Sequence, residues 1–430
     1  MKIHLRMLGC RLNQAEIDTM ARQFIQQGHE IVNDATDADN VIVNTCAVTH
    51  GAERTSRKLI RELHRANHNT EITVTGCYAQ IAPDDLLNMP EVAQVVDNAN
   101  KDAIVEQITG VAVAPFDHEP LNIAANPGAA ARTRAFVKVQ DGCENSCTFC
   151  VTTIARGGGR SREINEILGE IRYLHGVGFQ EIVLTGVHLG SYGYDLDDKN
   201  GLLKLVQTIL AETDIPRLRL SSLEPWDISP DFFDLWQNER MCRHLHLPLQ
   251  SGCDATLKRM LRHTNQDKFR SLVNAARQRI ADISITTDII VGFPGETDEE
   301  FAISRDFIEE MNFAKMHIFR YSKRPGTAAA RMKNHVSDDV QKERSAILHD
   351  LSSRMSRQFA QGFSNQTRTV LWEQITGATE DGFINVGYTD NYIRVRGIDP
   401  RVLTNHITQA KMLNYDNNLC QMTVKAIPEK

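Results

Sequence analysis

The chain has 430 residues, of which 41% are hydrophobic and 24% charged, and its formal net charge is −7. These values are typical of globular proteins, and at about 150 residues per domain the length predicts two or three domains. No apolar run approaches the roughly 18 residues of a membrane-spanning helix, and the first residues lack the apolar core of a signal peptide. We therefore expect a cytoplasmic protein without membrane contact. Its nine cysteines are too few for a disulfide scaffold, so metal ligands or buried thiols are expected.

Residues 1–114 alternate between strand and helix patterns, which predicts a doubly wound parallel sheet. Short strands are predicted at residues 2–8, 41–43 and 72–74. Cys10, Cys46 and Cys77 follow these three strands. Because the carboxyl ends of parallel strands joined by right-handed crossovers lie at one edge of a sheet, the three thiols are expected to meet.

Residues 115–132 show no sustained period and are predicted to be a linker, and residues 133–366 are predicted to form the next domain. Its strands are expected at about residues 135–140, 181–185, 217–221, 244–247, 284–291 and 315–320. Its helices are expected at about residues 163–176, 201–213, 230–237, 254–262, 267–281 and 297–312. Six such repeats predict a partial (β/α)6 barrel with its active site at the carboxyl ends of the strands.

Residues 367–430 are predicted to form a small antiparallel β-barrel of the OB-like kind, because short alternating stretches are separated by glycine, asparagine and aspartate. Basic and acidic residues balance in this domain, so charge alone does not mark it as an RNA binder. Any electrostatic contact with RNA is therefore expected elsewhere in the chain as well.

Two windows are locally basic, with a balance of +6 over residues 315–333 and of +4 over residues 54–65. Each is explained either by a solvated surface or by contact with nucleic acid. The first window is expected on the mouth side of the barrel, and its candidate RNA contacts are Lys315, Arg320, Lys323, Arg324 and Arg331.

The densest cysteine group is Cys143, Cys147 and Cys150, in the loop after the first barrel strand. Three thiolates suit a [4Fe-4S] cluster, in which the fourth iron is left open for another ligand. A structural zinc site would need a fourth cysteine or histidine, and none is near in the sequence. Structural zinc and unrelated thiols are the alternatives. The isolated Cys242, Cys253 and Cys420 are expected to be ordinary thiols without a metal.

The Cys-x3-Cys-x2-Cys spacing at a barrel mouth resembles the radical S-adenosylmethionine superfamily, and the whole chain resembles its methylthiotransferases. The motifs that carry this resemblance are residues 8–16, 44–49, 75–80, 155–162, 220–225, 246–252 and 288–297. The last 64 residues resemble the TRAM domain, an RNA-binding barrel. Residues 9–16 and 182–193 are most similar to the branch that modifies threonylcarbamoyladenosine beside the tRNA anticodon.

The resemblance implies two [4Fe-4S] clusters and S-adenosylmethionine. One cluster, on Cys143, Cys147 and Cys150, would bind and cleave S-adenosylmethionine, and the auxiliary one, on Cys10, Cys46 and Cys77, would supply methylated sulfur. The product would carry a methylthio group at C2 of N6-threonylcarbamoyladenosine at position 37 in the anticodon loop. No side chain can ionise such an aromatic C–H bond near neutral pH, so a radical is needed. An electron donor and a sulfur source are implied as further partners.

Five residues near the barrel mouth are predicted to contact the cofactor. Phe149 would pack near the adenine, Gly186 would allow a close approach, and Arg156 would bind anionic groups. Glu224 and Gln250 would hydrogen-bond the ribose or amino group. The alternatives are a core aromatic for Phe149, a turn glycine for Gly186 and a supporting role for Glu224 and Gln250.

Other targets and a different class of function stay open from the sequence. Within the same chemistry, the substrate could be isopentenyl-adenosine in tRNA or an aspartate of a ribosomal protein. Outside it, the chain could be a non-enzymatic iron–sulfur protein that binds RNA or carries electrons.

Overall fold

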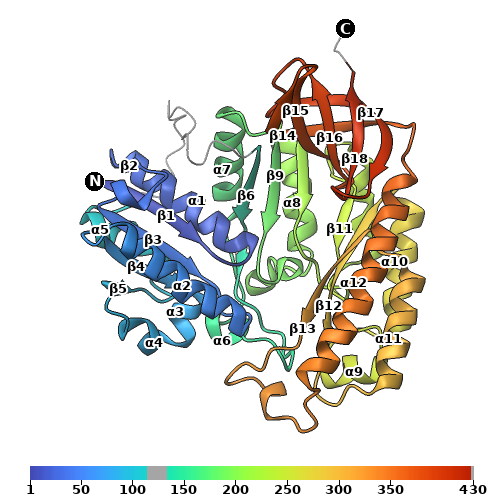
Figure 1. Cartoon of the computed structure of the whole chain (residues 1–430), viewed down its shortest axis with the longest axis horizontal. Helices are drawn as coiled ribbons and strands as arrows, with labels where there is room; N and C mark the ends of the chain where they lie inside the picture. Colours follow the sequence, from blue (N-terminus) through green and yellow to red (C-terminus); the bar gives the residue numbers. More distant parts are fainter. Residues whose placement is uncertain (114–132, 428–430) are drawn as a thin grey trace.

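The computed structural model describes residues 1–113 and 133–427, so the predicted linker at 115–132 lies outside the described residues. The first part folds as a parallel sheet in the order β2-β1-β3-β4-β5 (Figure 1). Its strands are β1 (Lys2–Met7), β2 (Glu30–Ile31), β3 (Asn40–Thr45), β4 (Glu71–Gly76) and β5 (Gln94–Val95). The two edge strands were not predicted, because two residues are too few to show a period.

Helices cover both faces of this sheet, as a doubly wound fold requires. They are α1 (Arg11–Gln26), α2 (His50–Ala66), α3 (Cys77–Ile81), α4 (Pro83–Leu87) and α5 (Ile104–Thr109). Successive residues of β3 point to opposite faces: Ile42 packs with α1 and α5, whereas Val41 and Val43 pack with α2 and the short helices that follow β4. The predicted doubly wound sheet is confirmed.

Six strands of the second part form an open barrel made of two parallel three-stranded sheets. One contains β6 (Arg134–Lys138), β9 (Glu181–Thr185) and β10 (Arg217–Leu220), and the other β11 (His244–His246), β12 (Ser284–Val291) and β13 (Lys315–Arg320). Isolated bridges between Leu218 and Met241 and between Ser222 and His246 join the two sheets at β10 and β11. The predicted partial barrel is therefore confirmed, and it stays open between β6 and β13.

Helices surround the outside of this barrel, and a short ribbon follows its first strand. The helices are α7 (Ile164–Gly176), α8 (Gly201–Glu212), α9 (Asp254–Arg259), α10 (Gln266–Arg279), α11 (Asp298–Met311) and α12 (Asp338–Gln361). The helix expected at 230–237 is a 3-10 helix, η5 (Pro230–Gln237). The ribbon pairs β7 (Gln140–Asp141) with β8 (Arg160–Ser161), and α6 (Thr152–Arg156) lies between its strands in the chain.

The last part is a closed five-stranded barrel in the order β14-β15-β16-β18-β17. The strands are β14 (Thr367–Thr379), β15 (Gly382–Thr389), β16 (Arg394–Asp399), β17 (Ile407–Asp416) and β18 (Gln421–Ala426). Fully buried Trp372 lies in its core, and its indole N–H donates to Thr408 Oγ1 at 2.8 Å. The expectation of an antiparallel barrel needs one correction, because β16 and β18 pair in parallel to close the ring.

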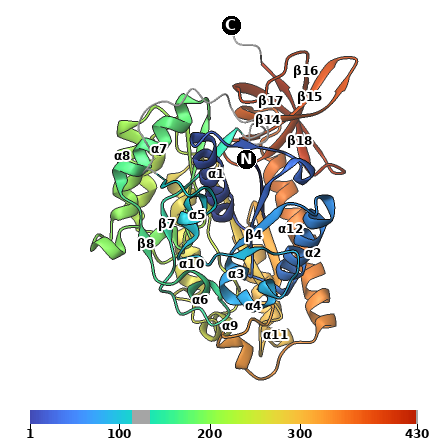
Figure 2. The ribbon, with the colours of Figure 1, turned by 90° about the vertical axis from the view of Figure 1, so that its left-hand side faces the viewer.

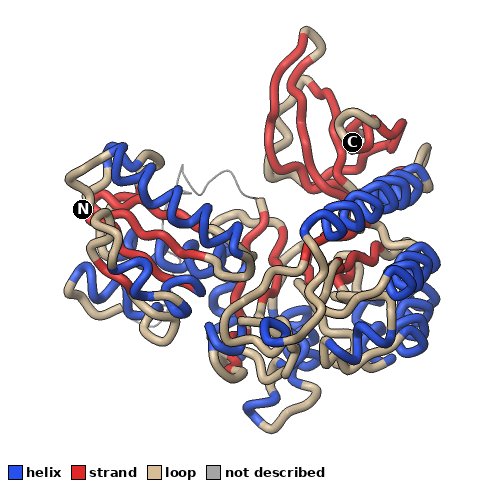
Figure 3. Tube along the Cα trace, turned by 60° about the horizontal axis from the view of Figure 1, so that its bottom comes forward, coloured by secondary structure: helices blue, strands red, loops and turns tan. Residues whose placement is uncertain are grey.

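The three parts lie around the open barrel. The first sheet lies on one side of it, and the C-terminal barrel lies at the amino ends of its strands (Figures 1 and 2). Arg217, at the start of β10, donates to Thr389 O at 2.9 Å, and Arg368 pairs with Asp282 just before β12. In Figure 3 the C-terminal barrel stands apart from the first sheet across the central strands. No helix among the described residues is both long and apolar enough to span a membrane.

Candidate functional site

Three thiols meet at the carboxyl edge of the first sheet. Cys10 is the N-cap of α1, Cys46 directly follows β3, and Cys77 is the first residue of α3. Gly9 has φ +115°, and a Cβ there would lie 2.9 Å from Cys46 Cβ, so only glycine lets these two loops pack together. Burial, together with the charges of Cys77 and Cys10, raises the pKa of Cys46 to about 11. The three thiols therefore lie within electrostatic reach of one another.

The other three cysteines lie in the loop between β7 and α6. The backbone N–H groups of Asn145 and Thr152 donate to the sulfurs of Cys143 and Cys150, each at 3.4 Å. Such donors stabilise a thiolate, which is the form that binds metal. Arg262 adds a third donor, at 3.6 Å from Cys147 Sγ.

The spacing of each trio favours a multi-iron cluster over a single zinc ion. All six thiols are free. Two sulfurs bound to one zinc at about 2.3 Å can be at most about 4.6 Å apart. Across the described residues, neither trio forms a group of ligand atoms that all lie within 4.8 Å of one another. The donor sets fit three-thiolate clusters, although the ligand role of each cysteine stays a prediction.

Arg156 joins the two trios, and this corrects the prediction that it binds anions of the cofactor. Its terminal nitrogens donate to Glu16 Oε1 at 2.8 Å, to Asp141 Oδ1 at 3.0 Å and to Asn13 Oδ1 at 2.9 Å. Asn13 Oδ1 also accepts from Cys10 Sγ at 3.6 Å. The guanidinium does bind carboxylates, but they belong to the protein and come from α1 and the β7 ribbon. It thereby connects the barrel loop to the first cysteine of the sheet.

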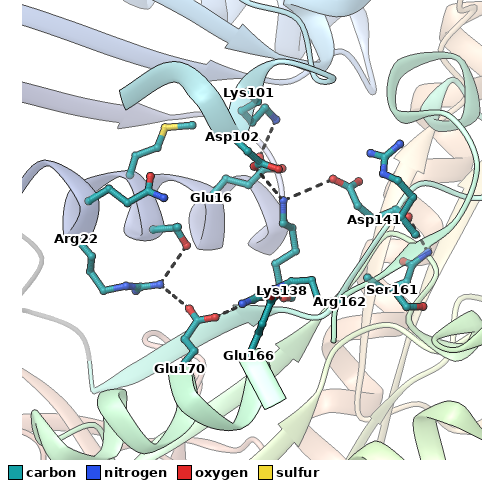
Figure 4. A pocket seen from close by; sticks show the side chains of 15 residues that line it. Glu16, Arg22, Lys101, Asp102, Lys138, Asp141, Ser161, Arg162, Glu166 and Glu170 are labelled. Carbon is teal, nitrogen blue, oxygen red and sulfur yellow. Dashed lines mark hydrogen bonds and ion pairs between the residues drawn. The ribbon is translucent and has the colours of Figure 1, made fainter. Parts of the chain in front are cut away.

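Further ion pairs continue from Arg156 along the contact between α1 and the barrel. Lys101 Nζ lies 2.8 Å from Glu16, and Arg22 and Arg162 both pair with Glu170 (Figure 4). A pocket of about 310 Å³ lies there, lined by acids and bases in equal number. The acids are Glu16, Asp102, Asp141, Glu166 and Glu170, and the bases are Arg22, Lys101, Lys138, Arg160 and Arg162. Because its charges are largely paired with each other, we interpret this pocket as part of the domain contact.

A second pocket, which we call the mouth pocket, lies between the loops of the two trios and measures about 190 Å³. Thr49, three residues after Cys46, lines it from the first sheet. Cys150 lines it from the barrel loop. The rest of its wall comes from the ends of the barrel strands and the loops beside them: Val48, Phe149, Val151, Thr152, Gln250, Asp288, Ile290, Phe319, Arg320, Tyr321 and Ser322. Of the six cysteines in the two trios, Cys150 is the one that lines this cavity, and the loop after Cys46 reaches its wall through Val48 and Thr49.

Two of the predicted cofactor contacts line the mouth pocket. Phe149 packs edge-on against Phe293, with ring centroids 6.4 Å apart, and still reaches the pocket wall. Gln250 adopts φ +74°, a left-handed conformation that is rare for a non-glycine residue and clusters at functional sites. Both positions agree with the predicted role, which no bound cofactor tests.

The other two predicted contacts have protein partners. Glu224 accepts two hydrogen bonds from Arg262, at 3.1 and 2.5 Å. Because Arg262 also donates to Cys147 Sγ, Glu224 acts on this cysteine through Arg262. A Cβ at Gly186 would lie 3.0 Å from Gln140 Oε1. Gln140 is therefore one group that approaches Gly186 closely, and the cofactor contact at Gly186 stays a prediction.

Two of the five candidate RNA contacts do not lie on the exposed surface at the mouth, and RNA contact by any of the five stays a prediction. Arg324 is buried and pairs with Glu53 of α2, and it also lies 3.3 Å from His50. Lys315 is exposed but begins β13, so it lies at the end of the strand away from the mouth. Arg320 ends β13, Lys323 and Arg331 lie beyond it, and all three are exposed. The Arg324–Glu53 pair also brings the basic helix α2 beside this loop.

Two residues near the site were missed from the sequence. Phe319 is 43% exposed and lines the mouth pocket. The sequence feature that could have identified it is an aromatic residue in an alternating strand next to basic residues. His188 Nε2 lies 2.5 Å from Asp227 Oδ2. Burial lowers the pKa of His188, but the hydrogen bonds with Asp227 and Cys143 outweigh burial and raise it to about 10. No local pattern could have revealed this pairing.

Comparisons with protein families agree with this division of the chain. Residues 2–97 match "Uncharacterized protein family UPF0004", and residues 137–308 match the "Radical SAM superfamily". The chain is also similar to solved radical S-adenosylmethionine methyltransferase structures of TsrM from Kitasatospora setae. One, with cobalamin and a [4Fe-4S] cluster bound, gives a TM-score of 0.56 at 16% identity over 76% of each chain. This likeness shows the fold alone.

Curated relatives are similar over nearly the full length. The Bacillus subtilis threonylcarbamoyladenosine tRNA methylthiotransferase MtaB is 36% identical over 90% of this chain and 88% of its own. The Thermotoga maritima protein of the same name is 35% identical over 96% of this chain and 95% of its own. A tRNA-2-methylthio-N(6)-dimethylallyladenosine synthase of Acetivibrio thermocellus is 33% identical over 88% of this chain and 82% of its own.

Proposed function

Since this chain belongs to the MtaB-type family of radical S-adenosylmethionine methylthiotransferases, we propose that it inserts a methylthio group at C2 of N6-threonylcarbamoyladenosine in tRNA. The target base lies beside the anticodon. The observation that carries the proposal is that one pocket is lined both by Cys150 of the barrel trio and by the loop that follows Cys46 of the sheet-edge trio. One group serves to generate a radical and the other to supply sulfur, and a pocket between them holds the base.

Each thiol group has a defined role in this proposal. Cys143, Cys147 and Cys150 hold a [4Fe-4S] cluster that binds S-adenosylmethionine, and Cys10, Cys46 and Cys77 hold the auxiliary cluster. When bound, these groups supply the carbon radical and the sulfur that no side chain can supply. The same chemistry requires an electron donor and a sulfur source.

The remaining work of the protein is positioning and exclusion of water. Arg262 places a positive charge against Cys147 while Glu224 balances it, so the loop carries little net charge toward solvent. Thr148 ties that loop to the barrel, because its hydroxyl donates to Arg259 O at 2.9 Å and its carbonyl accepts from Ala329 N at 2.8 Å. A rigid, enclosed mouth protects a reactive radical from side reactions.

The RNA is held by exposed cations around the mouth and by the C-terminal barrel, for which we propose a TRAM role. Arg320, Lys323 and Arg331 are exposed next to the mouth pocket, and α2 adds exposed Arg54 and other bases. A base in an anticodon loop is already partly unstacked, which lowers the cost of bringing it into the pocket. Acting on tRNA places the protein in the cytoplasm.

Nucleoside analysis tests the proposal directly. Bulk tRNA from cells without this gene should lack only the methylthio form of threonylcarbamoyladenosine, and purified protein with both clusters should restore it in vitro. Loss of the methylthio form of the dimethylallyl nucleoside instead would assign the chain to the other tRNA branch. A reduced protein that releases no 5′-deoxyadenosine from S-adenosylmethionine would point to a non-enzymatic role.

A further inference from the structure

An unusual row of side chains lies on the inner face of β13. Met316 and Ile318 pack against the barrel core, and Met316 N donates to Ser352 Oγ of α12 at 3.3 Å. Because alternate strand residues face opposite sides, Lys315, His317 and Phe319 point away from α12, toward the barrel interior. Inward residues of a small barrel are normally buried. Here the His317 and Phe319 side chains are 48% and 43% exposed, because the barrel is open beside β13.

His317 is held in one orientation by its neighbours. Its Nδ1 lies 3.1 Å from Asp288 Oδ1, and the other Asp288 oxygen lies 3.3 Å from His246 Nε2. His246 Nδ1 in turn lies 2.8 Å from Thr286 Oγ1. Both nitrogens of His246 are thus engaged. Among the described residues nothing bonds the Nε2 of His317, and the side chain is 48% exposed, so this nitrogen is available to a ligand.

The two ends of the row differ in chemistry. Phe319 lines the mouth pocket together with Cys150 of the barrel trio and Thr49 of the loop that follows Cys46. An exposed aromatic ring in such a place suits stacking of a nucleobase. Lys315, at the other end, is exposed and has no carboxylate partner among the described residues. From the carboxyl end of β13 to its amino end, the row offers the aromatic face of Phe319, an imidazole nitrogen of His317 and the ammonium group of Lys315.

We propose that this row reads the N6 substituent of the target base: adenine stacks on Phe319, and the threonylcarbamoyl carboxylate binds His317 Nε2 and Lys315. The inference rests on the proposed function and names the residues that select its substrate. It assigns Lys315 a role in recognising the substituent, and not in holding the RNA backbone at the mouth.

The spacing of the residues along β13 matches the length of the threonylcarbamoyl substituent. Residues two apart on a parallel strand are separated by about 6.6 Å. In the substituent, N6 and the threonyl Cα are joined through one trans amide, about 3.8 Å, and the carboxylate carbon lies about 1.5 Å farther. A base centred over Phe319 with N6 directed along the strand therefore brings its carboxylate to the level of His317, within reach of the long Lys315 side chain.

Charge gives this row its selectivity. Because the Asp288 carboxylate only accepts, His317 Nδ1 donates to it, and Nε2 carries a second proton for the substrate carboxylate only in the imidazolium form. A carboxylate that meets this imidazolium and the Lys315 ammonium forms charge-assisted hydrogen bonds with both. An apolar dimethylallyl substituent would cover the same groups without bonding them, and unpaired polar groups oppose binding. Unmodified adenine has no substituent to cover His317 and Lys315, so both groups stay hydrated and binding carries no desolvation penalty. The row is thus expected to favour the threonylcarbamoyl base over both alternatives.

Binding to three anticodon stem-loops tests the inference on the full-length protein with both clusters. The RNAs carry threonylcarbamoyladenosine, dimethylallyladenosine or adenosine at the target position. Lys315→Met and His317→Leu are each expected to weaken binding of the threonylcarbamoyl RNA about tenfold, the loss of one charge-assisted hydrogen bond, and to leave the adenosine RNA within twofold. Arg305→Met, which removes an exposed cation of the outer helix α11, should leave all three affinities unchanged.

The possible outcomes distinguish a failure of the proposed recognition by the β13 row from a failure of the proposed function. Equal weakening of all three RNAs by Lys315→Met would mean that Lys315 binds a backbone phosphate, and unchanged affinities would mean that the row does not touch the RNA; either result overturns the inference. Lys315→Arg, which keeps the charge, should retain most of the preference. If the wild-type protein modifies only the dimethylallyl RNA, the proposed function itself fails. Release of 5′-deoxyadenosine without RNA serves as the check that each variant is folded.

Discussion

At the scale of single residues, the two cysteine trios should be separable by substitution. Cys46→Ala removes a buried thiol of the sheet edge and leaves the barrel loop untouched. We expect this variant to lose all methylthio product but to retain 5′-deoxyadenosine release, because S-adenosylmethionine cleavage needs only the barrel trio. Cys147→Ala should lose both activities. Chromatography of one reaction mixture measures both products, and equal loss of both in Cys46→Ala would contradict separate roles.

We expect Arg156 to be a positioning residue, so that its substitution changes how the two trios are held relative to each other. It is 2% exposed and bonded to Glu16, Asp141 and Asn13. Arg156→Met leaves the buried Glu16 carboxylate with Lys101 as its ion-pair partner and a hydrogen bond from Asn44, and breaking such a buried network costs about 3–5 kcal/mol of unfolding free energy. Denaturant unfolding measures this loss.

Activity distinguishes positioning from simple stability. Below the melting temperature of Arg156→Met, we expect more 5′-deoxyadenosine released per methylthio group formed, because the two trios are no longer held in register. The matched control is Arg172→Met, which removes an exposed ion pair with Glu212 and should change neither quantity. An unchanged product ratio in Arg156→Met would show that the side chain is structural only.

At the scale of secondary structure, the sequence predicted most of the central barrel because buried parallel strands and amphipathic helices have clear periods. The bounds of β9, β12 and β13 agree with prediction to the residue. The sequence also predicted that strand ends would bring Cys10, Cys46 and Cys77 together, since this follows from topology alone. The parallel β16–β18 pair was missed, because pairing direction depends on how a barrel closes.

The charged residues were harder to predict, because their partners come from distant elements. Arg156 and Arg324 both looked available for ligand or RNA, yet each is bonded to a helix of the first sheet more than 100 positions away. A guanidinium fits a carboxylate of the protein as well as one of a ligand, so residue type alone cannot decide between them. Only the packing of α1 and α2 against the barrel does.

A buried charge cluster inside the barrel should give acid-sensitive stability. Glu181 of β9 lies 2.6 Å from Arg219 and 2.9 Å from Arg217 of β10. Burial raises the pKa of Glu181, but the charges of Arg219 and Arg217 outweigh it, so the pKa is held well below its ordinary 4.5. The stability from this group is therefore complete above about pH 4.5 and is lost as pH falls further.

Melting curves of Glu181→Gln check this prediction. At pH 7 the variant should melt well below the wild type, because two buried guanidinium groups lose their counter-charge. The difference should shrink as pH is lowered from about 4.5, where the wild-type carboxylate loses its advantage. A difference that is constant from neutral pH down to about pH 3.5 would contradict the assigned cause.

At the scale of the whole molecule, RNA binding should be strongly dependent on salt although the net charge is −7. Exposed Lys323 and Arg331 lie beside the mouth on the same loop. Replacing each with alanine should reduce the slope of log affinity against log salt by about one for every phosphate that is no longer neutralised. Arg305→Ala on the outer helix α11, an exposed arginine that pairs with its neighbour Asp306, is the control. Identical slopes for all variants would exclude this loop from the RNA interface.

The central claim is that two thiol trios hold two clusters on either side of one substrate pocket. Anaerobic reconstitution with iron and sulfide counted per chain tests it most directly. We predict about eight irons in the wild type and about four in both Cys46→Ala and Cys147→Ala, since each [4Fe-4S] cluster holds four. About four irons in the wild type, unchanged by Cys46→Ala, would show that the sheet edge holds no cluster and would contradict the account.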